Sequence, residues 1–225
     1  MNQLQEIISI IYTVLTVLIV LSQYLYKENT PTTPLRLITR ISMLIFTIYI
    51  VSSSEFSFLN PFLITMAFLL TVIADFFFAA QKSIHGVVFF IFTYITLFFT
   101  FNPAADFQHK LYLIPFLVIF SGVFFYLRHY EHRKIIQAGA LIFGLSLSAA
   151  AWALVTTSYR GFSPCVSTMT FVSGILLFIS DMFVAYSMRF NQKFICWLEN
   201  TIWITYMIGW TLLMLVIADN SILTI

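Results

Sequence analysis

Two aspartates, Asp75 and Asp181, are the residues of this sequence whose type and position suggest chemistry. Of the nine acidic residues, only these two are flanked on both sides by long apolar stretches. The others lie in polar segments, near the chain ends or beside an apolar run: Glu6, Glu28, Glu55, Asp106, Glu131, Glu199 and Asp219. An aspartate inside a bilayer costs about 2.5–3.5 kcal/mol on insertion scales, so it normally faces the protein interior and has a function.

The two aspartates are predicted to lie at the same depth. Asp75 comes seven residues before Lys82, and Asp181 comes eight residues before Arg189. At 1.5 Å per helical residue, each carboxyl would lie roughly 10–12 Å inside the end of its helix. Because the two apolar segments also run in the same direction, we expect both carboxyl groups to face one polar cavity. Their separation would be within roughly 10 Å, the outer range for paired catalytic carboxylates.

The sequences around the two aspartates are alike. Residues 73–79 (IADFFFA) and 179–185 (ISDMFVA) share the pattern I-small-D-x-F-x-A. Ala79 and Ala185 follow the acids by one helical turn, where a small side chain allows close helix packing. The two copies are 106 residues apart, close to half of the 225-residue chain. This offset suggests two four-helix halves related as parallel repeats.

Composition places these residues in a membrane protein. The chain is 60% hydrophobic and 9% charged, with a mean hydropathy of +0.96, whereas a soluble domain carries about 25% charged residues. Its apolar runs are continuous and close to the roughly 20 residues that a spanning helix needs, which argues against a β-barrel. The sequence predicts an all-α transmembrane bundle, a single domain over residues 1–225. About eight spans are expected, near 6–26, 36–53, 58–80, 84–101, 110–127, 134–157, 165–187 and 197–218.

The basic residues predict the side of the membrane that each loop faces. Nine of the 11 Lys and Arg residues lie at the loops between the first and second, third and fourth, fifth and sixth, and seventh and eighth predicted spans. They are Lys27, Arg36, Arg40, Lys82, Arg128, Arg133, Lys134, Arg189 and Lys193. Lys110 and Arg160 are the two at the other loops. The positive-inside rule then places both termini outside and the aspartates toward the cytoplasmic side. The first span lacks a basic n-region and a cleavage site, so we expect a retained helix. Short loops suit a bacterial inner membrane.

Five other residues could support the aspartates from the same side: Lys82, His85, Ser180, Glu199 and Tyr206. Lys82 lies on the helical face of the first aspartate and could pair with it, although plain positive-inside anchoring is the simpler interpretation. His85 begins the fourth span at the interface. Tyr206 shares a stripe of the last span with Glu199, and its hydroxyl could reach a buried carboxyl. With one histidine near a span, a three-histidine metal site is not available.

Three stretches carry a family resemblance: residues 74–79 with Gly86, residues 174–181 with Ala185, and Thr205-Tyr206 with Gly209. On these residues the sequence resembles the YhhN-like family, which includes the lysoplasmalogenases. The resemblance covers spans three, four, seven and eight, and it implies eight spans. The sequence departs from the family pattern at two places. Thr93 and Tyr94 stand where a histidine is expected inside the fourth span, and Trp210 stands where a glutamine is usual.

The resemblance implies hydrolysis of the vinyl ether bond of lysoplasmalogen, with Asp75 and Asp181 as the catalytic residues. A vinyl ether is cleaved by protonating carbon, which produces an oxocarbenium ion that water then captures. One carboxyl would donate the proton while the other stabilises the cation and activates water, as two carboxylates do in glycosidases. The expected partners are a lysophospholipid substrate and membrane lipids, with no nucleic acid, no metal and no cofactor. The oligomeric state stays open.

Three alternative functions use the same aspartates. A proton-coupled transporter of small solutes or lipids would use them as relay groups, and parallel repeats are common in transporters. Against this interpretation, Pro115 is the only proline well inside a span, so the paired helix breaks of many transporters are missing. An intramembrane aspartyl protease also uses two aspartates, but no G-x-G-D motif is present. In a structural protein, protonated or hydrogen-bonded aspartates would only hold helices together.

Overall fold

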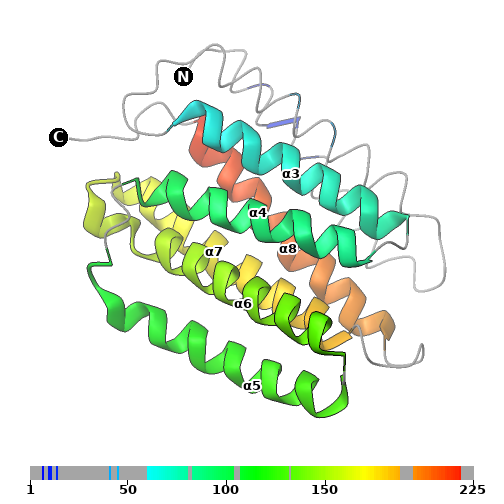
Figure 1. Cartoon of the computed structure of the whole chain (residues 1–225). Helices are drawn as coiled ribbons and strands as arrows, with labels where there is room; N and C mark the ends of the chain where they lie inside the picture. The colour runs from blue at the N-terminus through cyan, green and yellow to red at the C-terminus, as the bar shows by residue number, and fades with distance from the viewer. Residues whose placement is uncertain are drawn as a thin grey trace.

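The computed structural model describes residues 60–80, 83–103, 107–131, 133–187 and 195–218, together with six isolated positions within the first 45 residues. Over these ranges the chain forms a bundle of α-helices (Figure 1). The α-helices are α3 (Pro61–Ala79), α4 (Ser83–Phe101), α5 (Ile114–Tyr130), α6 (Lys134–Val155), α7 (Pro164–Ser187) and α8 (Ile195–Ala218). Two 3-10 helices, η1 (Lys110–Leu113) and η2 (Thr157–Arg160), precede α5 and α7.

These helices correspond to the third to eighth predicted spans. The largest difference is at the fifth, where the α-helix begins at Ile114 and not at residue 110, because the 3-10 helix η1 comes first. Four segments are long and apolar enough to cross a membrane: Ile84–Phe101, Lys110–His129, Lys134–Val155 and Pro164–Tyr186. The apolar stretches of α3 and α8 are shorter. The predicted spans near 6–26 and 36–53 lie outside the described residues, so the total of eight stays a prediction.

Local sequence fixes where α3 and α7 begin. The Asn60 side chain accepts hydrogen bonds from the backbone N–H groups of Phe62 (3.0 Å) and Leu63 (3.4 Å), and proline follows it at the first helical position. Such a cap satisfies donors that have no partner within the helix, and proline is pre-set for this position. In α7, too, a proline (Pro164) is the first helical residue, and Gly161 turns the chain before it with a left-handed φ of 79°. Both helices that carry the aspartates therefore have defined starts.

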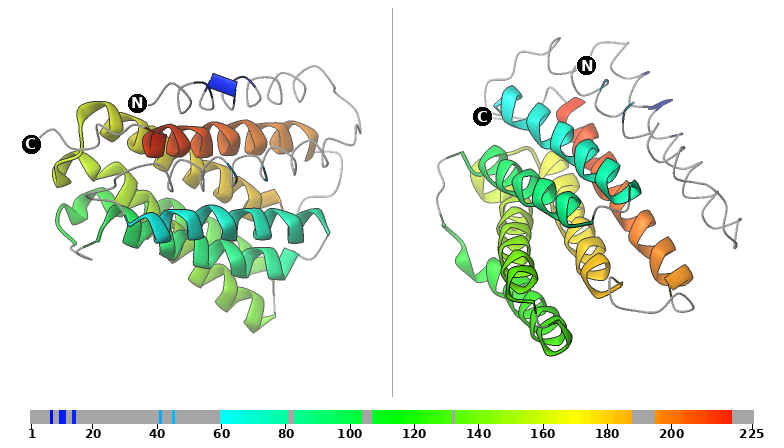
Figure 2. Two further views of the ribbon diagram at one scale, coloured as in Figure 1. Left: turned by 90° about the horizontal axis from the view of Figure 1, so that it is seen from above. Right: turned by 45° about the vertical axis from the view of Figure 1, so that its right-hand side comes forward.

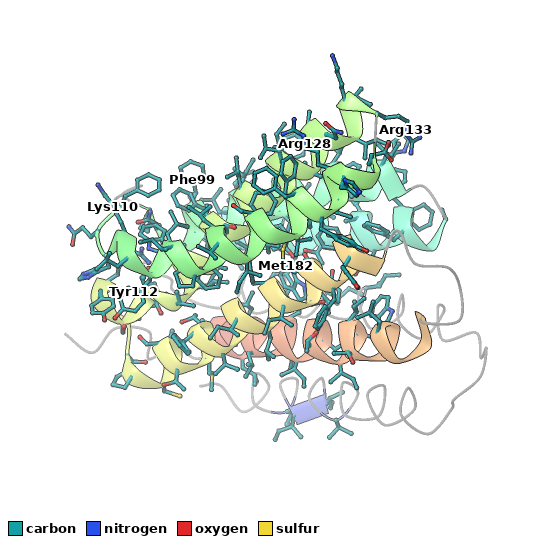
Figure 3. The ribbon with its side chains drawn as sticks, turned by 90° about the horizontal axis from the view of Figure 1, so that it is seen from below. Phe99, Lys110, Tyr112, Arg128, Arg133 and Met182 are labelled. Carbon is teal, nitrogen blue, oxygen red and sulfur yellow. The ribbon has the colours of Figure 1, made fainter. Side chains whose placement is uncertain are left out.

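Consecutive helices run antiparallel, and α3 packs against α4 as closely as α7 packs against α8. Helix α4 also contacts α6, and α6 contacts α7. Among the described helices, Figure 1 shows α5 at one edge and α3 at the opposite edge, and the turned view in Figure 2 keeps α5 at an edge. We call the end where α5 meets α6 the basic end. Arg128 and Arg133 are labelled there in Figure 3, and Lys110 is labelled at the other end.

Glycines let the paired helices approach closely. A Cβ atom added at Gly86 of α4 would lie 2.5 Å from the Phe78 ring of α3, and one at Gly209 of α8 would lie 2.8 Å from Leu177 of α7. Small residues at such contacts bring helix backbones together in membrane proteins. Ser173 adds a hydrogen bond from its hydroxyl to the carbonyl oxygen of Gly209, at 2.8 Å. Gly86 and Gly209 thus allow α3 and α7, which carry the aspartates, to pack closely against α4 and α8.

Arg160 joins two helix ends at the end of the bundle opposite the basic end. Its Nη1 atom donates to the carbonyl oxygens of Phe101 (3.3 Å) and Ala153 (2.7 Å), near the ends of α4 and α6. The guanidinium also lies 5.0 Å from the centroid of the Trp152 ring, which is fully buried. A cation at a helix C-terminus is favoured by the helix dipole, so this side chain holds α4 and α6 together.

Candidate functional site

Asp75, in the last two turns of α3, is half-buried and faces α8. The hydroxyl group of Tyr206 donates to its carboxyl group, at 3.1 Å from Oδ1 and 3.4 Å from Oδ2. Tyr206 is itself only 4% exposed. This hydrogen bond joins α3 to α8 through two residues that are 131 positions apart in the sequence.

Asp181, in α7, is more deeply buried, with an exposed fraction of 3%. The hydroxyl of Tyr94 on α4 donates a hydrogen bond to its Oδ2 atom. Tyr94 is 1% exposed, so this Asp–Tyr pair lies in the core of the bundle. A hydrogen bond gains strength in such a low-dielectric interior.

The two Asp–Tyr pairs are reciprocal. Each aspartate lies on the first helix of one helix pair (α3 or α7), and its tyrosine lies on the second helix of the other pair (α8 or α4). Phe90 lies between the tyrosines, with its ring centroid 6.1 Å from that of Tyr94 and 6.0 Å from that of Tyr206. The four polar side chains therefore form one cluster around Phe90, while the expected separation of the carboxyl groups stays a prediction.

Asp75 lies nearer to the end of its helix than the sequence suggested. It is four residues before Ala79, the last residue of α3. At 1.5 Å per residue this interval is about 6 Å, compared with the expected 10–12 Å. The difference arises because α3 ends at Ala79, where the N–H of Ala80 bonds back to the carbonyl oxygens of Phe76 and Phe78.

Comparison with known protein families assigns the chain to a family. The profile of the YhhN family matches residues 35–217, which includes all of the described helices except the last residue of α8. The chain belongs to the YhhN family. No curated protein and no solved structure matches it. The family resemblance noted in the sequence is thereby confirmed, and both Asp–Tyr pairs of this YhhN protein lie within the matched region.

Aromatic rings form the walls around the aspartates of this YhhN protein. Phe77 stacks on Phe89 with ring centroids 5.3 Å apart, Phe78 lies 5.7 Å from Phe90, and the Tyr94 ring contacts Phe143 edge-on at 6.0 Å. Asp181 is only 3% exposed, so bulk water hardly reaches its carboxyl, whereas Asp75 is half-buried. Charged and hydrogen-bonding groups interact more strongly in a water-poor site, so the walls favour proton-transfer chemistry.

The predicted supporting residues have different positions. Ser180 donates to the carbonyl oxygen of Ile202 at 3.1 Å, so it joins α7 to α8 beside Asp181. His85 is exposed and stacks on Phe77 at 5.3 Å, which places it outside the two Asp–Tyr pairs. Lys82 lies outside the described residues. Glu199 lies in α8, and its side chain also lies outside them.

The sequence interpretation did not name Tyr94 as a site residue. It noted Thr93 and Tyr94 only as a departure from the family pattern. The available signal was a tyrosine in the middle of an apolar span, because a buried hydroxyl needs a partner. The second departure, Trp210, is fully buried 6.3 Å from Tyr206, and among the described residues its indole N–H has no hydrogen-bond partner. Both departures therefore lie at the cluster.

Proposed function

We propose that this YhhN protein is a membrane hydrolase that cleaves the vinyl ether bond of lysoplasmalogen. The products are a fatty aldehyde and a glycerophospho-alcohol. The observation that carries the proposal is the pair of carboxyls within a helical bundle, each hydrogen-bonded to a tyrosine of the opposite helix pair and walled by aromatic rings. Two fixed carboxyls, one as proton donor and one as proton acceptor, are what acid-catalysed addition of water requires.

The reaction needs one proton donor and one proton acceptor. A carboxylic acid transfers its proton to the carbon of the double bond that is not attached to oxygen, which leaves an oxocarbenium ion. A carboxylate stabilises this cation and takes a proton from the attacking water, as in glycoside hydrolysis. The resulting hemiacetal breaks its C–O bond to give aldehyde and alcohol, and the site regains its original proton count. Because a close carboxyl pair titrates as a unit, the acid and base roles are not divided between Asp75 and Asp181.

The tyrosines give these carboxyls fixed orientations. Tyr94 and Tyr206 are both almost fully buried, and each donates to one aspartate. A carboxyl held in one rotamer keeps its proton donor or acceptor atom at a constant position relative to a bound substrate. Such positioning lowers the entropy cost of reaching the transition state. In this proposal, Tyr94 and Tyr206 are positioning residues.

The location suits a single-chain lipid substrate. Four described segments are long and apolar enough to cross a membrane, so a lipid tail can stay in hydrocarbon while its head reaches the site. The distribution of basic residues supports an inner-membrane protein with both termini outside and the aspartates toward the cytoplasm. The substrate would then come from the cytoplasmic leaflet.

Aldehyde release from lysoplasmalogen by purified, monodisperse protein tests the proposal. Asp75→Asn and Asp181→Asn should each lower turnover about 10²–10⁴-fold, because asparagine keeps the size but neither donates an acidic proton nor carries charge. The double variant should be little worse, since residues that act as a unit are not additive. Glu131→Gln, an acid-to-amide change in the α5–α6 turn, is the control and should retain activity.

Two outcomes would contradict the hydrolase. Near-wild-type turnover per folded molecule in either single aspartate variant would exclude the two-carboxylate mechanism. Wild-type protein that moves protons across vesicle membranes but releases no aldehyde would instead favour a proton-coupled transporter.

A further inference from the structure

Exposed cations gather where α5 ends and α6 begins. Arg128 lies in the last turn of α5 and Lys134 is the first residue of α6, and both side chains are exposed. Arg133, the N-cap residue of α6, is exposed as well. Figure 3 labels Arg128 and Arg133 at this basic end of the bundle. Two adjoining helix ends therefore build one positively charged surface.

The acid at this surface is bound to one of the three cations. Arg133 contacts both carboxylate oxygens of Glu131, with Nε 3.0 Å from Oε1 and Nη2 2.9 Å from Oε2. Among the described residues, no carboxylate pairs with Arg128 or Lys134. Lys134 also lies at the positive pole of the α6 helix dipole, and the first turn of α6 contains no acid. An anion from outside the chain would offset this unfavourable concentration of positive charge.

Apolar side chains adjoin the cations on both helices. On α5, Val118, Phe125 and Arg128 are spaced by seven and three residues, so they share one exposed face of the helix. On α6, Lys134 shares an exposed face with Leu145, three helical turns later. Phe125 is 63% exposed. Exposed apolar faces that end in cations are typical of helices that pass from lipid tails to the headgroup level.

The two apolar faces extend to similar depths from their cations. Val118 and Arg128 are ten residues apart, and Lys134 and Leu145 are eleven residues apart, which is about 15 and 17 Å of helix. One leaflet contributes about half of a hydrocarbon core that is roughly 30 Å thick. With both faces in the tails of one leaflet, Arg128 and Lys134 lie level with its phosphate groups.

We infer that the basic end of the bundle binds the headgroups of anionic phospholipids, with Arg128 and Lys134 as the contacting cations. A zwitterionic lipid carries an ammonium group that compensates its phosphate, whereas a lipid with net negative charge can neutralise both cations. Each Lys or Arg near such a surface raises the affinity by about fivefold. This surface is separate from the Asp–Tyr cluster, so its lipid preference does not depend on the proposed hydrolysis.

Fluorescence quenching by brominated lipids tests this preference at the basic end. Full-length protein with Cys165→Ser and Cys196→Ser would carry a bimane label on Phe125→Cys, one helical turn from Arg128. Vesicles would mix phosphatidylglycerol and phosphatidylcholine, with one of the two lipids brominated in each series. The ratio of quenching gives the relative affinity of the two lipids beside the label. Phosphatidylglycerol should be preferred by roughly 5–25-fold, for one or both cations in contact with it.

Two glutamine variants locate the cations responsible. Arg128→Gln combined with Lys134→Gln should bring the preference close to one, and an unchanged Tm in neutral detergent would show that this variant is folded. Lys110→Gln is the matched control, because it removes an exposed cation at the opposite end of the bundle, and it should leave the preference unchanged. Raising the salt concentration from about 0.1 to 1 M should weaken the preference, since the screening length falls from about 10 to 3 Å.

Two results would overturn the anionic lipid site. Equal quenching by the two brominated lipids before any glutamine substitution would mean that the cations face water or an acidic protein. A preference that persists in the Arg128→Gln, Lys134→Gln variant, or that Lys110→Gln lowers equally, would place the anionic lipid elsewhere on the chain.

Discussion

Replacing Tyr94 by phenylalanine isolates the most deeply buried polar contact of the cluster. The change removes one hydroxyl, which donates to the Oδ2 atom of Asp181, and it keeps the ring that packs against Phe90 and Phe143. Tyr94 and Asp181 are 1% and 3% exposed, so water is a poor substitute for the lost hydroxyl. The variant therefore measures the hydrogen bond with little change in packing.

The size of the effect depends on the charge of Asp181. A hydrogen bond to an ionised group contributes about 1.5–3 kcal/mol to the free energy of unfolding, and one between neutral groups contributes about 0.5–1.5 kcal/mol. In a protein of 150–250 residues, 1 kcal/mol corresponds to roughly 2–4 °C in Tm. With an ionised Asp181, Tyr94→Phe should lower Tm by about 3–12 °C. Tyr206→Phe should have a smaller effect, because Asp75 is only half-buried.

Thermal unfolding of purified full-length protein in detergent, followed by tryptophan fluorescence, measures these shifts. The control is Tyr112→Phe, which removes a hydroxyl that is 2.6 Å from the hydroxyl of Tyr159. These two tyrosines are 43% and 50% exposed, so water replaces the lost partner and Tm should change little. If Tyr94→Phe shifts Tm no more than this control, the buried Asp–Tyr pair does not stabilise the bundle, and its proposed positioning role is refuted.

Two further predictions concern stability and topology. Arg160→Met should cost roughly 2–3 kcal/mol of unfolding free energy, because it removes hydrogen bonds to carbonyls near the ends of α4 and α6 and a cation–π contact with Trp152. Arg160→Lys should recover only part of this stability, and equal Tm values for all three proteins would contradict the role. In a Cys196→Ser background, a membrane-impermeant maleimide added outside cells should label Cys165, which is exposed at the start of α7. It should not label a cysteine placed at Arg133, and the reverse pattern would invert the proposed topology.

Sequence reasoning located the described helices because continuous apolar runs depend on local composition alone. It identified Asp75 and Asp181 by the same argument, since a charged residue within such a run is conspicuous. The helix ends were less accurate, because caps and 3-10 turns decide them. Helix α3 begins after the Asn60 cap and ends at Ala79, and η1 delays the start of α5 to Ile114.

The hydrogen-bond partners of the aspartates could not be read from the sequence in the same way. The Asp181–Tyr94 and Asp75–Tyr206 pairs span 87 and 131 residues, and which helix faces meet over such separations is set by packing of the whole bundle.

The reciprocal pairs connect the repeat seen in the sequence with the proposed chemistry. If α3–α4 and α7–α8 descend from one duplicated unit, a two-fold axis along the membrane normal would relate them. Under this symmetry, if an aspartate of α3 contacts a tyrosine of α8, then an aspartate of α7 must contact a tyrosine of α4. Both contacts occur. Symmetry alone would make the two carboxyls equivalent. Their environments differ, because Asp181 is buried while Asp75 is half-buried. Two carboxyls in unlike environments can hold a proton unequally, and that inequality is what a reaction with one proton donor and one acceptor requires.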